Sequence, residues 1–498
     1  MPETTSPEPP RLHRSLGVVD GIALAASSTA ATTSIGIGMG ALAATVGLQA
    51  PAVLLIAFLP IIGIAAAYAR LNRSEPNMGS GYVWVGKSLG PWFGFLTGWV
   101  TFVGTMIFMA YTSAVTGSVL LQFANKAGLH SLLGLGLDPN STALSTVVGL
   151  GVLAAVTVTA VTGVRRATRF QTWLLVFEYA VLLVFCGWAL VSGGHAFDWS
   201  WFNPFDIKDG TSFAQGLVLA VFFFWGWDAA FSVTEETKDT RDVGRGGFIA
   251  LLTMLALFLY GSVAFQREMS LGELIAQGPQ GLTYLGAKLA AEPWASLPML
   301  ALMCSAVASL QSSVIPTARG LLAMGRDRTM GRVWTRISPR YGSPALGTIL
   351  VTAIAAVVAL LALAIPKLNE MILAAVNSIG LIVALYYGLT ALACAARFRS
   401  DLRTSFPLAL RSVIAPGVSG LALLGIGGYL GHSYFTMSDH FELSPDNGWF
   451  MLAVPTAVVV SGLGMAAWAK YGRRSPYFTS RRGSNTNEPV PALLDQTS

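Results

Sequence analysis

Charged residues are scarce in this chain of 498 residues. Asp, Glu, Lys and Arg together make up 11% of it, against about 25% in a typical soluble domain. This scarcity excludes a soluble globular enzyme. Hydrophobic residues make up 53%, and apolar runs of about 20 residues, enough to cross a hydrocarbon core about 30 Å thick, recur along the chain. The sequence therefore predicts an all-α integral membrane protein.

Cysteine and histidine are also scarce. The three cysteines fall within apolar runs, so we expect them to pack rather than to form disulfides. The five histidines fall in predicted loops or tails, and the chain has no His-Glu-x-x-His motif. We therefore expect no metal, no cofactor and no catalytic residues, which argues against an enzyme. A channel is also disfavoured, because the spans supply almost no polar or charged pore lining.

The few basic residues are placed asymmetrically. Twelve spans are predicted, at residues 17–45, 51–70, 91–122, 143–163, 170–192, 212–235, 246–266, 297–325, 345–365, 371–395, 412–431 and 449–469. Alternate connections carry 25 and 5 of the Lys and Arg residues, and Arg319 lies within a span. This asymmetry predicts a multi-pass protein of the cytoplasmic (inner or plasma) membrane with both termini in the cytoplasm. The net charge of +6 is then a topology signal, and nucleic-acid binding is not expected.

Two of these spans are interrupted by residues that weaken a helix. In span 212–235, Gly226 and Asp228 interrupt a strongly apolar run. A carboxylate in hydrocarbon costs roughly 2.5–3.5 kcal/mol, so Asp228 is expected to face a cavity or a partner. Span 17–45 contains a hydroxyl-rich run over residues 27–34, followed by glycines at 36, 38 and 40. These are the first and sixth spans. Because five is an odd number, a repeat that begins at the sixth span crosses the membrane in the opposite direction to one that begins at the first. Interrupted helices at matching places in two inverted repeats are typical of transporter binding sites.

Three segments resemble motifs of the amino acid–polyamine–organocation transporter superfamily. Residues 222–239 are similar to its Phe-Phe-x-x-x-Gly-Phe-Asp/Glu…Glu-Glu-x-Lys-Asn-Pro pattern, particularly in the cationic amino acid branch. Residues 76–99 resemble the family's loop into its third span, and residues 318–328 with 342–344 resemble the exit from its eighth. The resemblance covers about residues 16–470. It implies a LeuT-like fold of twelve transmembrane helices with a five-plus-five inverted repeat and discontinuous helices 1 and 6.

The predicted organisation follows from these patterns. A transporter domain occupies residues 16–470, with inverted repeats at about 16–195 and 210–396 and additional helices in 412–470. The flanking segments 1–15 and 471–498 are polar and rich in proline or serine, so they are predicted to be disordered cytoplasmic tails.

The substrate site is expected where the two interrupted spans meet. The family breaks the first span at Gly-Ser/Ala-Gly, and the best register places Thr32, Thr33 and Ser34 there instead. Their hydroxyls compete for helix hydrogen bonds. If these residues unwind, the following half-helix offers N–H groups and a positive dipole end to a substrate carboxylate. The alternative is that they are small residues that permit close helix packing.

The other half of the site is expected around Gly226. Carbonyl groups freed near Gly226 would accept hydrogen bonds from a substrate ammonium, and the rings of Phe222, Trp225 or Trp227 would cover it. The alternative is that these rings pack against neighbours or lipid. Asp228 is expected to pair with a cationic substrate or take up a proton, or else to be a structural carboxylate that holds the broken helix.

Glu178 is the second carboxylate within a span, with no compensating charge nearby in sequence. The resemblance places its span close to spans 1 and 8, where sodium binds in sodium-coupled relatives, so Glu178 is a natural proton carrier. The alternative is a permanently protonated group bonded to a hydroxyl. By the same analogy Ser312 and Ser313 lie near this coupling region, with polar packing as the alternative, and Arg319 is expected to snorkel to the cytoplasmic surface.

Together these features predict a secondary active transporter of amino acids or related amines that works by alternating access, with proton-coupled symport or exchange. The alternatives are an antiporter of polyamines or other organic amines, or a membrane-embedded sensor without transport. The expected partners are a small-molecule substrate, protons and the lipid bilayer, and the sequence does not indicate the oligomeric state. Span 371–395 adds lower-ranked candidates to line the path: Asn377, Ser378, Tyr386 and Tyr387.

Overall fold

The computed structural model describes residues 16–132, 135–162, 164–364, 368–442, 444 and 447–479, and this part of the chain is almost entirely helical. The predicted tail 1–15 lies outside it. The α-helices are α1 (Val18–Thr29), α2 (Ala31–Val46), α3 (Ala50–Ser74), α4 (Gly81–Leu89), α5 (Pro91–Lys126), α6 (Thr142–Val161), α7 (Val164–Ser192), α8 (Gly210–Phe223), α9 (Thr240–Glu268), α10 (Leu271–Gln277), α11 (Gly281–Leu289), α12 (Leu297–Arg326), α13 (Ala345–Leu361), α14 (Leu368–Arg397), α15 (Phe406–Ala409), α16 (Ala415–Met437) and α17 (Gly448–Ala467). The described residues also contain one two-residue antiparallel strand pair, β1 (Ser131–Leu132) with β2 (Leu135–Gly136).

Eleven helical stretches of the described chain are long and apolar enough to cross a membrane. The first of them, Val18–Ser74, has 57 residues and joins α1, α2 and α3, so it contains the first two predicted spans. The remaining ten coincide with the other predicted spans to within a few residues at most ends. The chain is thus a helical multi-pass membrane protein.

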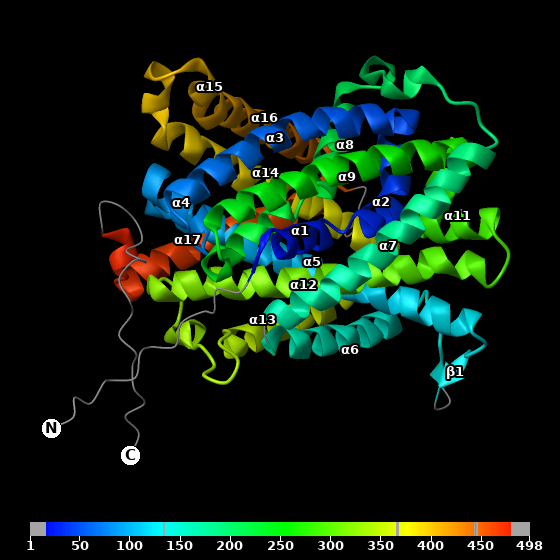
Figure 1. Ribbon diagram of the computed structural model, residues 1–498, viewed down its shortest axis with the longest axis horizontal. Coiled ribbons are helices and arrows are strands. Elements are labelled where there is room, and N and C mark those ends of the chain that lie inside the picture. Colours follow the sequence, from blue (N-terminus) through cyan, green and yellow to red (C-terminus); the bar gives the residue numbers. More distant parts are fainter. Residues whose placement is uncertain are drawn as a thin grey trace.

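The long helices form a bundle in which α3, α9, α5 and α12 run roughly alongside one another (Figure 1). Helices α6 and α13 lie at one edge and α15 and α16 at the other, while α1 packs inside against α7, α9 and α12. The outer helices expose apolar side chains, as α7 does with Trp173 and Val191. An apolar outer surface on helices of this length is what a bilayer requires, because lipid cannot hydrogen-bond to polar groups. Cys186, Cys304 and Cys394 are free thiols within the described residues.

The first predicted helix break is present, but it lies at Ala30 rather than at residues 32–34. Helix α1 ends at Thr29, Ala30 takes a left-handed conformation (φ +50°), and α2 begins at Ala31. The hydroxyl residues still hold the break. The Thr33 N–H donates to Oγ of Ser305 on α12 (3.3 Å), and the Ser34 hydroxyl donates to the Thr29 carbonyl (3.1 Å). The position of the break is therefore set by contacts with another helix as well as by local sequence.

The second break falls at the predicted Trp-Gly-Trp-Asp segment. Helix α8 ends at Phe223, Gly226 has a φ of +108°, and a 3-10 helix, η4 (Trp227–Glu236), continues the chain. Only glycine adopts such a backbone without strain. A Cβ atom at residue 226 would also lie 2.7 Å from the Ser28 carbonyl oxygen. The two breaks, 196 positions apart in sequence at Ala30 and Gly226, therefore meet in the interior.

The C-terminal end of the described chain is also ordered. Residues 471–479 belong to the predicted disordered tail, yet they include the end of a π-helix and a 3-10 helix, η12 (Pro476–Phe478). The Tyr477 ring stacks on Tyr82 (centroids 5.0 Å apart) in a slot left by Gly86 and Gly94. The prediction of disorder is thus wrong for residues 471–479, because buried aromatic packing holds them; residues 480–498 lie outside the described chain.

Candidate substrate-binding site

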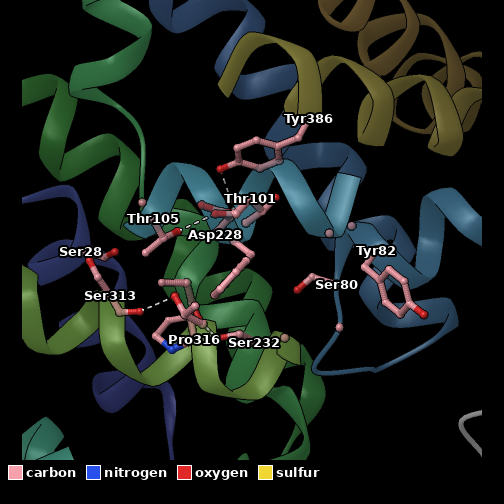
Figure 2. Close-up of a pocket in the computed structure, with 18 of the residues that line it drawn as sticks. Ser28, Ser80, Tyr82, Thr101, Thr105, Asp228, Ser232, Ser313, Pro316 and Tyr386 are labelled. Carbon is pink, nitrogen blue, oxygen red and sulfur yellow. Dashed lines mark hydrogen bonds between the residues drawn. The ribbon is translucent and has the colours of Figure 1, made fainter. Parts of the chain in front are cut away.

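A cavity of about 110 Å³ lies directly beside the second helix break. We call it the Asp228 cavity. Its walls come from α1, α3, α5, α12, α14, η4, the start of α4 and the loop before it. Figure 2 shows Asp228, Thr101 and Thr105 together, with Tyr386 on one side and Ser28 and Ser313 on the other. Since one water needs roughly 10–15 Å³ measured this way, the cavity has room for a small molecule.

The Asp228 carboxylate is held by two neighbouring tyrosines of α14. Tyr387 donates to its Oδ1 (2.9 Å) and Tyr386 donates to its Oδ2 (3.4 Å). The Tyr386 hydroxyl in turn accepts a hydrogen bond from the Trp225 indole N–H (2.5 Å). Asp228 is thus hydrogen-bonded as a structural carboxylate would be, while it also lines the cavity.

A second and larger cavity, of about 550 Å³, lies on the other side of the breaks. We call it the Thr33 cavity. It is lined by α2 along most of its length, by α8, by α14, by the end of α16 and by the segment that joins α10 to α11. Glu273, in the first turn of α10, caps that helix, and the Ser270 backbone N–H and the Lys288 ammonium hold the pKa of Glu273 down at about 2. Tyr284 donates a further hydrogen bond to this carboxylate (3.0 Å).

Three residues line both cavities: Ser28, Phe108 and Trp225. The rings of Phe108 and Trp225 meet edge to face, with centroids 5.2 Å apart. Along α5, the residues from Gly98 to Thr105 line the Asp228 cavity alone, Phe108 lines both, and Tyr111 lines the Thr33 cavity alone. The two cavities are therefore stacked along the helix axis, with the Phe108–Trp225 pair between them.

The predicted substrate-binding residues are divided among the Asp228 cavity, the Thr33 cavity and the packed interior. Trp225 lines both cavities, and the others fall into three groups. Gly226 and Asp228 line the Asp228 cavity; Thr33, Ser34 and Phe222 line the Thr33 cavity; Thr32 and Trp227 are fully buried and line neither. The Trp227 ring packs against Tyr68, Phe231 and Tyr387. In this conformation, Thr33 and Ser34 line a different cavity from Asp228, whereas Phe222 and Trp225 share the Thr33 cavity with them.

The predicted coupling residues are divided as well. Ser312 and Ser313 line the Asp228 cavity, where both hydroxyls donate to the Ser309 carbonyl. Glu178 lines neither cavity and is completely buried on α7, facing the hydroxyls of Ser305 and Thr32. Neither oxygen of Glu178 has a hydrogen-bond partner among the described residues. Glu178 therefore lies beside the first helix break, since Ser305 also binds the Thr33 N–H.

Ion pairs connect η4 to α12 at the end of the Asp228 cavity. Arg319 Nε donates to Glu236 Oε1 (2.8 Å), and both side chains are buried. Arg326 pairs with Glu235 (3.1 Å), which also accepts the Met78 N–H. The expectation that Arg319 snorkels is wrong, because its guanidinium is 1% exposed and neutralised by Glu236. Glu235 and Glu236 therefore connect η4 to α12 through charge pairs.

Sequence analysis missed or under-ranked several lining residues. Tyr386 lines the Asp228 cavity and, with Tyr387 behind it, holds Asp228, although the sequence favours neither tyrosine strongly; nothing in the sequence points to Phe108, Thr101 or Thr105. A signal was present for the tyrosines, since two adjacent phenols stand out in an apolar span. Nothing in the sequence distinguishes Phe108 from the many other aromatic residues of the spans.

The match to known proteins agrees with this architecture. Residues 16–427 match the amino acid permease family, so the chain belongs to that family, within the amino acid–polyamine–organocation superfamily.

Individual relatives are about 25% identical to the chain over the aligned residues. They include the vacuolar cationic amino acid transporter 4 of Arabidopsis thaliana (26% identity over 73% of this chain), the low-affinity putrescine importer PlaP of Escherichia coli K12 (25% over 61%) and the branched-chain amino acid permease BcaP of Bacillus subtilis 168 (24% over 68%). The chain covers 61%, 66% and 72% of these relatives' own lengths.

Proposed function

We propose that the protein is a secondary active transporter of amino acids or related amines, working by alternating access in the cytoplasmic membrane with both termini in the cytoplasm. The proposed fold is the LeuT-like arrangement of twelve spans, in which α1–α2 and α8–η4 are the discontinuous helices 1 and 6 of two inverted repeats. Membership of the amino acid permease family supports this proposal. So do the names of the relatives, which mention amino acids or putrescine.

One observation carries the proposal: two stacked cavities are separated where two broken helices meet. Ser28 from the first broken helix and Trp225 from the second line both cavities. A transporter needs a site that is reached from one side at a time, with irregular backbone at the binding level. In the proposed mechanism, movement of Trp225 away from Phe108 joins the cavities around a bound substrate, and tilting of the broken helices closes the opposite side.

Proton coupling is assigned to Glu178 in this proposal, with Asp228 recognising substrate charge. Glu178 is buried, without a hydrogen-bond partner among the described residues, and faces Ser305, which receives the Thr33 N–H. A change of charge on Glu178 would therefore act directly on the contacts that hold the first break. Asp228 is assigned to substrate charge because it lines the Asp228 cavity, whereas Glu178 lines neither cavity.

The test is accumulation of radiolabelled amino acids and amines by proteoliposomes that contain the full chain, with and without an imposed pH gradient. We expect uptake above that of empty liposomes for at least one compound, increased by the gradient. Trp225→Ala, which removes the partition, should abolish accumulation against a gradient. Failure of every compound in a broad panel to accumulate would exclude the transport function.

A further inference from the structure

The charges around the two cavities are very few. Among the described residues that line them, Asp228 is the single acidic side chain, and no Lys, Arg or His is present. The buried carboxylate of Glu178 lines neither cavity. The described residues that line the two cavities therefore contribute one negative charge, located beside the Phe108–Trp225 partition.

The uncharged polar groups near Asp228 are arranged to accept hydrogen bonds. Their hydroxyls already donate to backbone carbonyls of their own helices, at 2.6–3.1 Å: Thr101 to Thr97, Thr105 to Thr101, Ser232 to Ala229, Ser312 and Ser313 to Ser309, and Thr317 to Ser313. A hydroxyl has one donor and two acceptor positions, so the oxygens retain lone pairs for a ligand. A wall of acceptors favours a ligand that donates, such as an ammonium group.

Aromatic rings complete this environment. Trp225, Tyr386 and Phe108 all line the Asp228 cavity, and the Trp225 N–H and Tyr386 O–H are engaged with each other and with Asp228. Their faces attract cations through the ring quadrupole but carry no net charge. The rings and hydroxyl oxygens can therefore solvate a cation, and only Asp228 can neutralise one.

From this charge count we infer that the transported substrate carries one net positive charge, as a monoamine or a cationic amino acid does, and that diamines and longer polyamines are poor substrates. The inference rests on the proposed transport function and narrows it. A second ammonium without its own carboxylate would be buried unpaired, which is unfavourable in a low-dielectric site. A ligand without net charge would leave the Asp228 charge unneutralised, and an anionic ligand would be repelled by it.

Four compounds of similar chain length test this inference: lysine (+1), 1-aminopentane (+1), cadaverine (+2) and norleucine (0). Lysine differs from cadaverine by its carboxylate and from norleucine by its terminal amine. We expect lysine and 1-aminopentane to inhibit uptake of the transported compound at concentrations at least about tenfold lower than the other two, since an unpaired buried charge costs more than a tenfold change in affinity. Cadaverine as effective as lysine would overturn the inference and leave the transport function standing.

Two variants assign the preference to Asp228. Asp228→Asn should bring lysine and norleucine to within about threefold of each other, whereas Asp228→Glu, which retains the charge, should preserve their order. Asp206→Asn removes an exposed carboxylate outside both cavities and is the matched control, expected to behave as the unmodified protein. An unchanged ranking in a folded Asp228→Asn protein would overturn the inference. If that variant does not fold, the ranking on the unmodified protein still decides it.

Discussion

The Trp225 indole nitrogen lies 2.5 Å from the Tyr386 hydroxyl, and that hydroxyl contacts Asp228. The side chain that separates the two cavities is therefore connected, through one phenol, to the carboxylate proposed to recognise substrate. A ligand ammonium that takes the place of Tyr386 on Asp228 would weaken the hold on Trp225 as well. Substrate recognition and opening of the partition would then be one event.

Tyr386→Phe tests this connection, because it removes both hydrogen bonds and keeps the ring. Because the Tyr386 hydroxyl competes with the ligand ammonium for Asp228, the loss of a typical hydrogen bond, about 0.5–1.5 kcal/mol, predicts a fall in KM of about two- to twelvefold. The measurement is initial uptake rate against substrate concentration in proteoliposomes. Tyr429→Phe, which removes an exposed hydroxyl bonded to Thr211, should leave KM unchanged. Equal KM values for both variants would show that the Tyr386 hydroxyl has no part in binding.

Glu178→Gln tests the proposed proton carrier. The amide retains the size of the side chain but cannot exchange a proton, so uptake by the variant should vary little with pH across a range in which uptake by the unmodified protein changes severalfold. Substrate exchange without a pH gradient should persist. The measurement is uptake and exchange at a series of pH values. A pH profile that coincides with that of the unmodified protein would rule out coupling through Glu178.

The buried pair of Arg319 and Glu236 predicts a non-additive effect on stability. Glu236→Gln leaves the buried guanidinium without its counter-charge and should lower the free energy of unfolding by about 3–5 kcal/mol. Adding Arg319→Met removes the stranded charge and should recover most of that loss. Thermal unfolding of the purified protein provides the measurement.

A matched control for this pair is available on the surface. Glu292→Gln breaks the pair with Lys126, in which both side chains are substantially exposed, and should change stability by at most about 1 kcal/mol. A double variant as unstable as Glu236→Gln alone would contradict the proposed origin of the loss.

Gly226→Ala tests the meeting of the two breaks. A left-handed backbone costs a residue with a Cβ atom roughly 1–2 kcal/mol. The added methyl group would also lie 2.7 Å from the Ser28 carbonyl oxygen, so the unfolding temperature should fall. Gly151→Ala, in the interior of α6 with open space around it, should instead stabilise the protein by about 0.5–1 kcal/mol. Similar shifts for the two variants would argue against the close approach of Gly226 and Ser28.

The cap of α10 predicts a pH effect outside the membrane. The pKa of Glu273 is lowered to about 2, so its hydrogen bonds stabilise the cap fully above the ordinary carboxyl pKa of 4.5. This contribution is lost as the pH falls toward 2. Glu273→Gln should increase hydrogen exchange of the α10 amides at pH 6, and the difference from the unmodified protein should shrink as the pH is lowered from 4.5. A difference that does not change with pH would exclude the carboxylate as its cause.

Local sequence was sufficient for the spans and for the break at Gly226. The spans can be predicted from local sequence because the thickness of the bilayer sets the length and apolarity that a spanning helix needs. Gly226 carries its own signal, because a glycine beside a carboxylate is conspicuous in an apolar helix. The first break lacked such a signal, since Ala30 is a good helix former, and its place depends on the contact of Thr33 with Ser305, 272 residues away.

Long-range pairing also explains the other differences. The sequence predicts that Arg319 reaches the cytoplasmic surface because it lies about a turn and a half before the end of its span, yet Glu236 lies 83 residues away and neutralises it in the interior. Tyr386 meets Asp228 across 158 residues. A single sequence contains no measure of such distances, so it indicated the individual polar residues of the site but not which of them share a cavity.

The stacking of Tyr477 on Tyr82 has a practical consequence for anyone who handles this protein. Tyr82 is part of the wall of the Asp228 cavity, and Tyr477 supports that wall from behind. A deletion, protease site or affinity tag that disrupts residues 475–479 would remove a contact that supports the wall of the Asp228 cavity. Ligand measurements on such shortened protein would describe a differently shaped cavity, so the C-terminus is best left intact to at least Thr479.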